Sequence, residues 1–123
     1  MDNLDKKTYQ HKNLASGGWE MLPLNVQMGN IGSEVSRAIK WKDKNNERAL
    51  KSINRALELT DLTVVSLVKN KRFGSLKEIC RGREVLCDYF YGDNVYVSNP
   101  QSLQRYYDRF ANMKKRGDSN YNG

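Results

Sequence analysis

Four amphipathic segments, each bounded by residues that start or stop a helix, constrain this chain more than any other feature. Within each segment, apolar residues recur at alternating three- and four-residue steps, which places them on one face of an α-helix. The connections between the segments are short, and short connections favour antiparallel neighbours. The sequence therefore predicts an all-α fold, an antiparallel up-and-down four-helix bundle. The segments begin near Pro23, just after Asn45 or Asn46, at Ser75 and at Asn99, and they end near residues 43–46, within residues 69–74, at Gly92 and at Gly117.

The start signals of the last two helices are the clearest. Ser75 and Glu78 fit a capping box, in which each side chain accepts a hydrogen bond from a backbone N–H exposed at the helix start. Asn99 is a good capping residue, and Pro100 suits the first helical position because it has no N–H to satisfy. Between these helices, residues 92–99 could hold an extended segment too short to build a sheet.

The chain of 123 residues has the size of one domain. Residues 1–18 are polar and end in two glycines, so we expect a flexible leader, and residues 117–123 are an expected flexible tail. The bundle itself should occupy residues 19–116.

Two glycines interrupt helical patterns at places where a helix would normally avoid them. Gly32 lies near the middle of the first helix and Gly82 near the middle of the third. Because glycine has no Cβ, neighbouring backbones can approach more closely there than the usual ~8–10 Å. We expect a close contact of the first helix through Gly32, with the third helix at Gly82 as the candidate partner; a kink at Gly32 is the alternative.

The charge is basic and uneven. The formal net charge is +7, which favours nucleic acid, an acidic protein or an anionic surface as partner. Residues 69–83 hold six basic residues and one acidic residue, and residues 100–116 hold five and one. Up-and-down topology brings these segments to one end of the bundle, the basic pole, where a phosphate-binding footprint is expected. Its candidate residues are Lys69, Lys71, Arg72, Lys77, Lys114, Lys115 and Arg116.

The basic pole also has a purely structural explanation. Cations at helix C-termini are favoured by the helix dipole, and basic surface residues keep proteins soluble. Arg48 and Lys51 lie nearer the other end, and we expect them to contribute little to binding. That other end should gather aromatic residues, which could stack on bases but are more often core or interface residues. These aromatic residues are Trp41, Tyr89, Phe90, Tyr91 and Tyr96, with Tyr106 and Tyr107 nearby.

An ion-pair network is expected near the middle of the bundle, on the facing first and third helices. Its members are Glu34, Arg37, Arg81, Arg83 and Glu84.

No catalytic or metal-binding signature is visible. The one histidine, His11, lies in the leader, and no histidine follows an arginine as in helical ribonuclease toxins of the HEPN class. Cys80 and Cys87 are roughly 10 Å apart on one helix, too far for a disulfide, so reduced thiols in a cytoplasmic protein are expected. We therefore predict no enzyme activity, no cofactor and no metal. No membrane partner is expected either, because no apolar run approaches the ~20 residues of a spanning helix.

The runs NVQMGNIGSEVSRAIKWKDKNNERALKSINRALELTDLT and REVLCDYFYGDN resemble an uncharacterised family of small bacterial four-helix-bundle proteins. The resemblance spans most of residues 19–115 and implies a helical bundle but no particular activity. In fold and charge the chain is also similar to intervening-sequence-encoded bundle proteins and to accessory proteins of diversity-generating retroelements, which form rings and bind nucleic acid.

Two functions are therefore expected. The first is a non-catalytic accessory protein that binds the backbone of RNA or DNA beside a separate enzyme subunit. The second is a protein–protein adaptor, such as the antitoxin-like or substrate-binding partner of a toxin or nucleotidyltransferase.

The second helix carries more apolar residues than one core face requires. At 100° per residue, Leu59, Leu62 and Val65 lie away from the core stripe, where a lone bundle would expose them. A strip of three apolar residues on an outer face indicates a second buried surface. We expect a homo-oligomer packed through this strip, a dimer by default or a ring by the resemblance.

Overall fold

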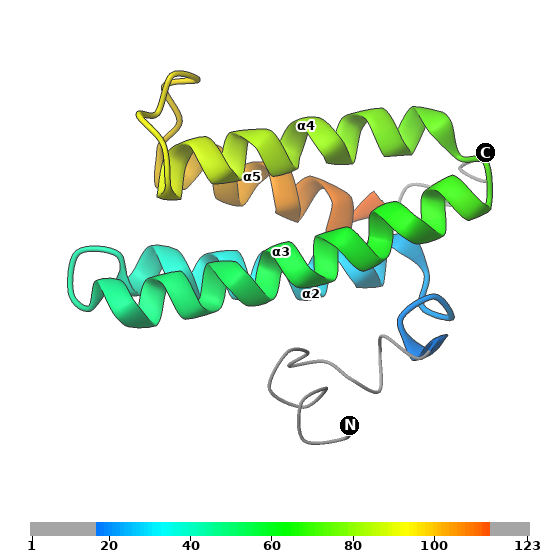
Figure 1. Cartoon of the computed structure of the whole chain (residues 1–123), viewed down its shortest axis with the longest axis horizontal. Coiled ribbons are helices and arrows are strands. Elements are labelled where there is room, and N and C mark those ends of the chain that lie inside the picture. The colour runs from blue at the N-terminus through cyan, green and yellow to red at the C-terminus, as the bar shows by residue number, and fades with distance from the viewer. Residues whose placement is uncertain (1–16, 114–123) are drawn as a thin grey trace.

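The computed structural model describes residues 17–113, which contain four α-helices and no strand. Consecutive helices run in opposite directions along one long axis (Figure 1). The expected all-α up-and-down bundle is confirmed. Predictions about residues 1–16, Lys114, Lys115, Arg116 and the tail lie outside the described residues. The helices are α2 (Leu24–Trp41), α3 (Asn46–Lys69), α4 (Phe73–Phe90) and α5 (Pro100–Ala111).

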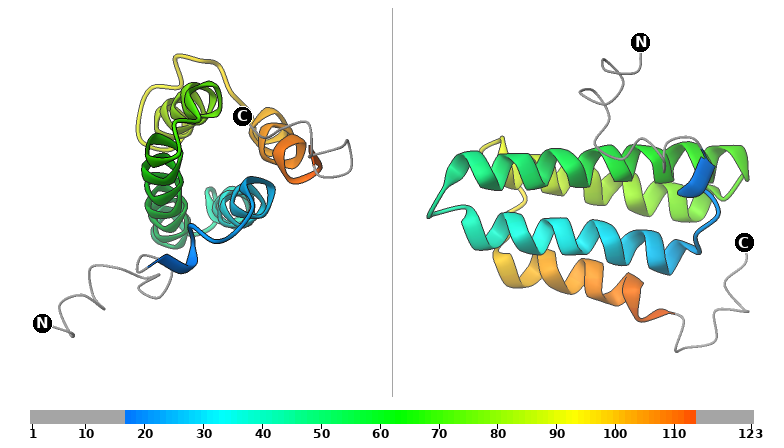
Figure 2. Two further views of the ribbon diagram at one scale, coloured as in Figure 1. Left: turned by 90° about the vertical axis from the view of Figure 1, so that its right-hand side faces the viewer. Right: turned by 90° about the horizontal axis from the view of Figure 1, so that it is seen from below.

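The helices pack in the spatial order α4, α3, α2, α5. The close pairs are α3 with α4, α2 with α3, and α2 with α5. Viewed end-on, α4 and α5 stand at the two ends of this curved row (Figure 2). The last helix therefore docks chiefly on the first, and side chains of α5 fill the space toward α4.

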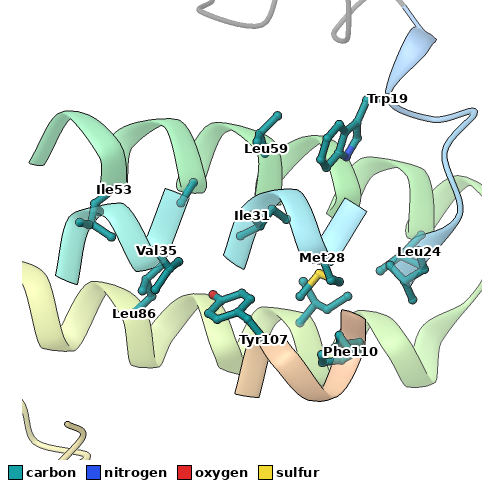
Figure 3. Packing of buried hydrophobic residues seen from close by; sticks show 14 residues of the cluster. Trp19, Leu24, Met28, Ile31, Val35, Ile53, Leu59, Leu86, Tyr107 and Phe110 are labelled. Carbon is teal, nitrogen blue, oxygen red and sulfur yellow. The ribbon is translucent and has the colours of Figure 1, made fainter. Parts of the chain in front are cut away.

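The core lies between the inward faces of all four helices (Figure 3). Met28, Ile31 and Val35 follow one face of α2 and are almost fully buried. Each such side chain contributes roughly 1.5–3 kcal/mol on burial. They meet residues of the other three helices, and the cluster includes Ile53, Ile79, Leu86, Tyr107 and Phe110.

Gly32 and Gly82 are both explained by consecutive tyrosines of α5. A Cβ on Gly32 would lie 2.9 Å from Tyr107 Cβ, and one on Gly82 would lie 2.6 Å from Tyr106 Cζ. The expected close approach at Gly32 is confirmed, but its partner is α5, so the predicted contact with Gly82 is wrong. The two glycines do share a height in the bundle, because neighbouring residues of one helix fill the spaces that they leave.

The predicted capping box at the start of the third helix is wrong. α4 begins at Phe73, so Ser75 lies in its first turn, and the N-cap residue Arg72 makes no side-chain capping bond. The reason is the end of α3, where Arg72 N–H donates to Leu67 O (2.9 Å) and Lys71 N–H to Val68 O (3.1 Å). These two bonds turn the chain sharply through Lys71, whose φ is +56°, and leave no room for a longer loop.

The caps of α3 and α5 are confirmed. The Asn45 side chain accepts from Arg48 N–H, and Asn99 forms a reciprocal capping box with Ser102. α5 nevertheless ends at Ala111 and not at Gly117. Asn112 stops it, because its side chain donates to Asp108 O at 2.8 Å and satisfies a last-turn carbonyl.

The segment before α2 covers one face of α3. The Trp19 indole N–H donates to Thr63 Oγ1 at 2.8 Å, and Gln27 Nε2 donates to Trp19 O at 2.9 Å. Leu59 lies one turn before Thr63 on the same face and is only 2% exposed (Figure 3). The expectation that Leu59 faces solvent is therefore wrong, because this part of α3 is covered by the chain itself.

The other two residues of the predicted outer strip differ in exposure. Leu62 is partly buried and packs against the core cluster. Val65 is 63% exposed. Of the three residues of the strip, only Val65 is an exposed apolar side chain.

Candidate nucleic-acid interface

The basic pole is assembled by the end of α3 and the start of α4, at the right in Figure 1. Lys71 and Lys77 are exposed, and neither makes an ion pair with another described residue. Lys69 differs, because its Nζ lies 3.1 Å from a carboxylate oxygen of Glu20. The fold therefore places four of the seven candidate residues at one end, with one of them neutralised by the segment before α2.

The expected ion-pair network is present only in part. The Glu34 carboxylate binds Arg37 of its own helix at 2.8 Å and Arg55 of α3 at 3.3 Å. Arg83 pairs instead with Asp61 of α3 at 2.8 Å. This hydrogen bond is the main cause that raises the pKa of the Arg83 guanidinium above its ordinary value, with partial burial opposing it.

A second basic surface, which sequence reasoning missed, lies on the hairpin of α2 and α3. A hollow of about 310 Å³ opens there, and among the described residues no carboxylate lines it. We call it the Trp41 groove, and its lining residues are Arg37, Trp41, Arg48, Lys51, Ser52 and Arg55.

Cations surround the indole of Trp41. The guanidinium carbon of Arg48 lies over the ring at 4.6 Å from its centroid, and Lys40 Nζ lies at 5.8 Å. Both distances fit cation–π attraction. Glu34, whose side chain is 13% exposed, holds Arg37 and Arg55 from beside the groove and fixes their positions.

The groove arises from two helical repeats brought together by the α2–α3 turn. Arg48, Lys51 and Arg55 recur at three- and four-residue steps on α3, and Arg37 and Trp41 are four residues apart on α2. The repeats were visible in the sequence, but their juxtaposition depends on the register of the two helices. The expectation that Arg48 and Lys51 contribute little to binding stays a prediction, although the fold places both beside Arg37 and Arg55.

The aromatic end is assembled as expected, at the opposite end from the basic pole. Tyr89 and Phe90 meet edge to face with ring centroids 5.0 Å apart, and Lys42 Nζ lies 5.1 Å from the Tyr89 centroid. The Tyr91 hydroxyl donates to Asn54 Oδ1 at 2.6 Å. These rings pack against the ends of α2, α3 and α4, which is the structural role weighed above.

The loop between α4 and α5 presents apolar side chains to solvent. Val95 is 77% exposed and Val97 81% exposed. The Asp88 carboxylate holds the loop by accepting from Val95 N–H (2.8 Å) and Tyr96 N–H (3.0 Å). Beside the loop is a cleft of about 350 Å³ between α4 and α5, crossed by Tyr106, whose hydroxyl donates to Glu78 O at 3.0 Å.

Residues 17–113 offer few groups for redox or metal chemistry. Cys80 is exposed, Cys87 is partly buried, and both are free thiols. In this range no three His, Cys, Asp or Glu side chains group so that they could hold a metal ion. None of the described helices is both long enough and apolar enough to span a bilayer.

Comparison with known proteins gives no relative: no family model, no curated protein and no solved structure matches this chain. The family resemblance therefore stays a prediction.

Proposed function

We propose that this bundle is a non-catalytic accessory protein that binds nucleic acid through its phosphates. The observation that carries the proposal is the surplus of exposed cations after the ion pairs of the bundle are made. Lys69, Arg83 and Arg109 are matched by carboxylates. Lys71 and Lys77, by contrast, have no acidic partner among the described residues.

Binding through phosphates is sequence-independent and depends steeply on salt. Each phosphate contact releases counterions, so the slope of log K against log salt is about −0.9 per contact on duplex DNA. The net charge of +7 draws a polyanion toward the protein before any specific contact forms. A protein of this kind would hold RNA or DNA for a separate enzyme that acts on it.

Fluorescence anisotropy with labelled duplex DNA and a labelled RNA hairpin tests the proposal. We expect binding at about 50 mM salt that weakens by at least tenfold at about 200 mM. Lys71→Glu with Lys77→Glu should weaken binding and reduce the salt slope by about two. Absence of binding at the lower salt, or binding indifferent to salt, would refute the proposal.

A second function, protein–protein adaptor, is favoured by the exposed loop of Val95, Tyr96 and Val97. Exposed apolar side chains held in a fixed conformation are typical of a protein contact. Affinity capture from a bacterial lysate distinguishes the two functions. Recovery of one acidic protein by the wild type but not by Val95→Ser with Val97→Ser, with no nucleic acid present, favours the adaptor.

A further inference from the structure

We propose that the Trp41 groove binds one nucleotide unit of a single-stranded nucleic acid, with its base stacked on the Arg48–Trp41 pair and its phosphate held by the neighbouring cations. This inference rests on the proposed function and adds to it a site, a strand type and a role for an aromatic residue. It concerns the hairpin of α2 and α3, far along the bundle from the basic pole of Lys71 and Lys77 (Figure 1).

The stacking platform is already assembled. The guanidinium carbon of Arg48 lies over the Trp41 indole at 4.6 Å from its centroid, and the Arg48 side chain is exposed. Unstacked bases pack on aromatic rings and equally on arginine guanidinium planes. A base in the groove can therefore pack against both the Arg48 guanidinium and the half-buried Trp41 indole beside it.

The phosphate-binding groups lie around that platform. Lys51 is exposed on the turn of α3 that follows Arg48, and Arg37 faces it from α2 as part of the same hollow. Arg37 and Arg55 are positioned by the shared Glu34 carboxylate, at 2.8 and 3.3 Å. Because the guanidinium presents five N–H donors, Arg37, which binds Glu34 through Nη1, keeps donors for a phosphate oxygen.

The position of Arg48 is unfavourable for the helix itself. It is the third residue of α3, after the N-cap Asn45, where the positive end of the helix dipole disfavours a cation. An anion in the groove would lie beside these cations and offset that cost. The local arrangement is costly for an empty surface and favourable for one that holds a phosphate.

The volume of the groove and the need for an accessible base face both favour a single strand. Its volume of about 310 Å³ is at the small end of the ~300–1,000 Å³ range of small-ligand sites, which suits one nucleotide. In a duplex, each base is stacked on its neighbours and its face is not available. Single strands offer unstacked bases, and proteins bind them by combining stacking on aromatic side chains with a basic groove.

Tryptophan emission and anisotropy together test the site. The chain has two tryptophans; Trp19 is buried against Thr63, so only Trp41 can meet a bound base. An oligothymidylate of about 12 nucleotides, within the ~4–16 nucleotides that single-strand binders cover, is the probe. We expect it to quench the emission of the wild type, and we expect Trp41→Phe to bind it but to show no quenching.

Affinity variants locate the binding energy. Arg48→Ala with Lys51→Ala removes two exposed cations, improves helix propensity and should weaken single-strand binding roughly tenfold or more. Lys71→Ala with Lys77→Ala removes the same charge from the basic pole and should weaken it about threefold or less while weakening duplex binding more. Far-ultraviolet circular dichroism should show that both variants keep the helicity of the wild type.

Three outcomes would overturn the assignment. Unchanged tryptophan emission on single-strand binding would mean that no base packs beside Trp41. Equal loss of single-strand binding in the two double variants would mean that the overall positive charge, and not the Trp41 groove, provides the binding energy. Competition by thymidine monophosphate at the same concentration as the oligonucleotide would make the ligand a free nucleotide. Duplex binding that persists in any of these cases leaves the proposed function standing, whereas absence of all nucleic-acid binding overturns both.

Discussion

Lys71 pays a conformational cost at the end of α3. Its φ of +56° lies in the left-handed region, which costs an L-residue about 1–2 kcal/mol and costs glycine nothing. Lys71→Gly should therefore raise the free energy of unfolding by about 1 kcal/mol in urea denaturation. Lys77→Gly makes the same chemical change inside α4 and should lower it by about 1 kcal/mol. Equal signs in the two variants would contradict this account.

Gly32 and Gly74 should respond in opposite ways to a methyl group. At Gly32 the new Cβ would lie 2.9 Å from Tyr107 Cβ, so α2 and α5 must separate. Gly32→Ala should cost about 1–3 kcal/mol of stability. At Gly74, in the first turn of α4, no heavy atom lies within 4 Å, and Gly74→Ala should stabilise by about 0.5–1 kcal/mol. Thermal unfolding of the two variants checks both signs.

Tyr107 links stability to alkaline pH. Burial is the main cause that raises the pKa of its hydroxyl well above the ordinary value of 10.0, with Tyr106 and Cys87 adding to it. Below pH 10 both the folded and the unfolded state hold the proton, so the contribution is constant. Above pH 10 only the unfolded state loses it, and stability falls by up to about 1.4 kcal/mol per pH unit. Tyr107→Phe should show a shallower fall in urea titrations between pH 9 and 11; an equal fall would contradict the assignment.

Among the elements, α5 depends most on its own cap, because it packs directly on α2 and reaches α4 through side chains. Asn99 supplies an oxygen that Ser102 N–H binds at 2.8 Å. Asn99→Ala should cost about 1 kcal/mol and speed hydrogen exchange in α5 before the other helices. Asn99→Asp keeps an acceptor and should cost less; exchange rates that rise equally in all helices would contradict a local effect.

For the whole molecule, assembly remains the main prediction. Val65 is the exposed residue of the predicted strip, so Val65→Glu should change the free energy of unfolding by less than about 0.5 kcal/mol. If the protein is a homo-oligomer through this face, light scattering should show a smaller mass for Val65→Glu at unchanged helicity. Leu62→Glu is a poorer probe, since Leu62 packs on the core and its loss destabilises the fold. A monomeric wild type at tens of micromolar would refute the prediction.

The helices were predictable because their signals are local. The three- and four-residue repeats, the Asn45 cap and the Asn99–Pro100 start each act within one or two turns, and the structure has helices at all of them. The start of α4 was not predictable, because the hydrogen bonds of Arg72 and Lys71 to the end of α3 override the signal of Ser75.

The sequence by itself determined the helix count, the alternating directions and the placement of the basic pole at the end opposite the aromatic residues, because these follow from local periodicity and short loops. Only the tertiary structure decided which helices touch. It placed the two tyrosines of α5 against Gly32 and Gly82, buried Leu59, and brought Arg37 and Trp41 beside Arg48 and Lys51. Such contacts depend on the rotation and register of packed helices, which are set by how all the side chains of the core fit together at once.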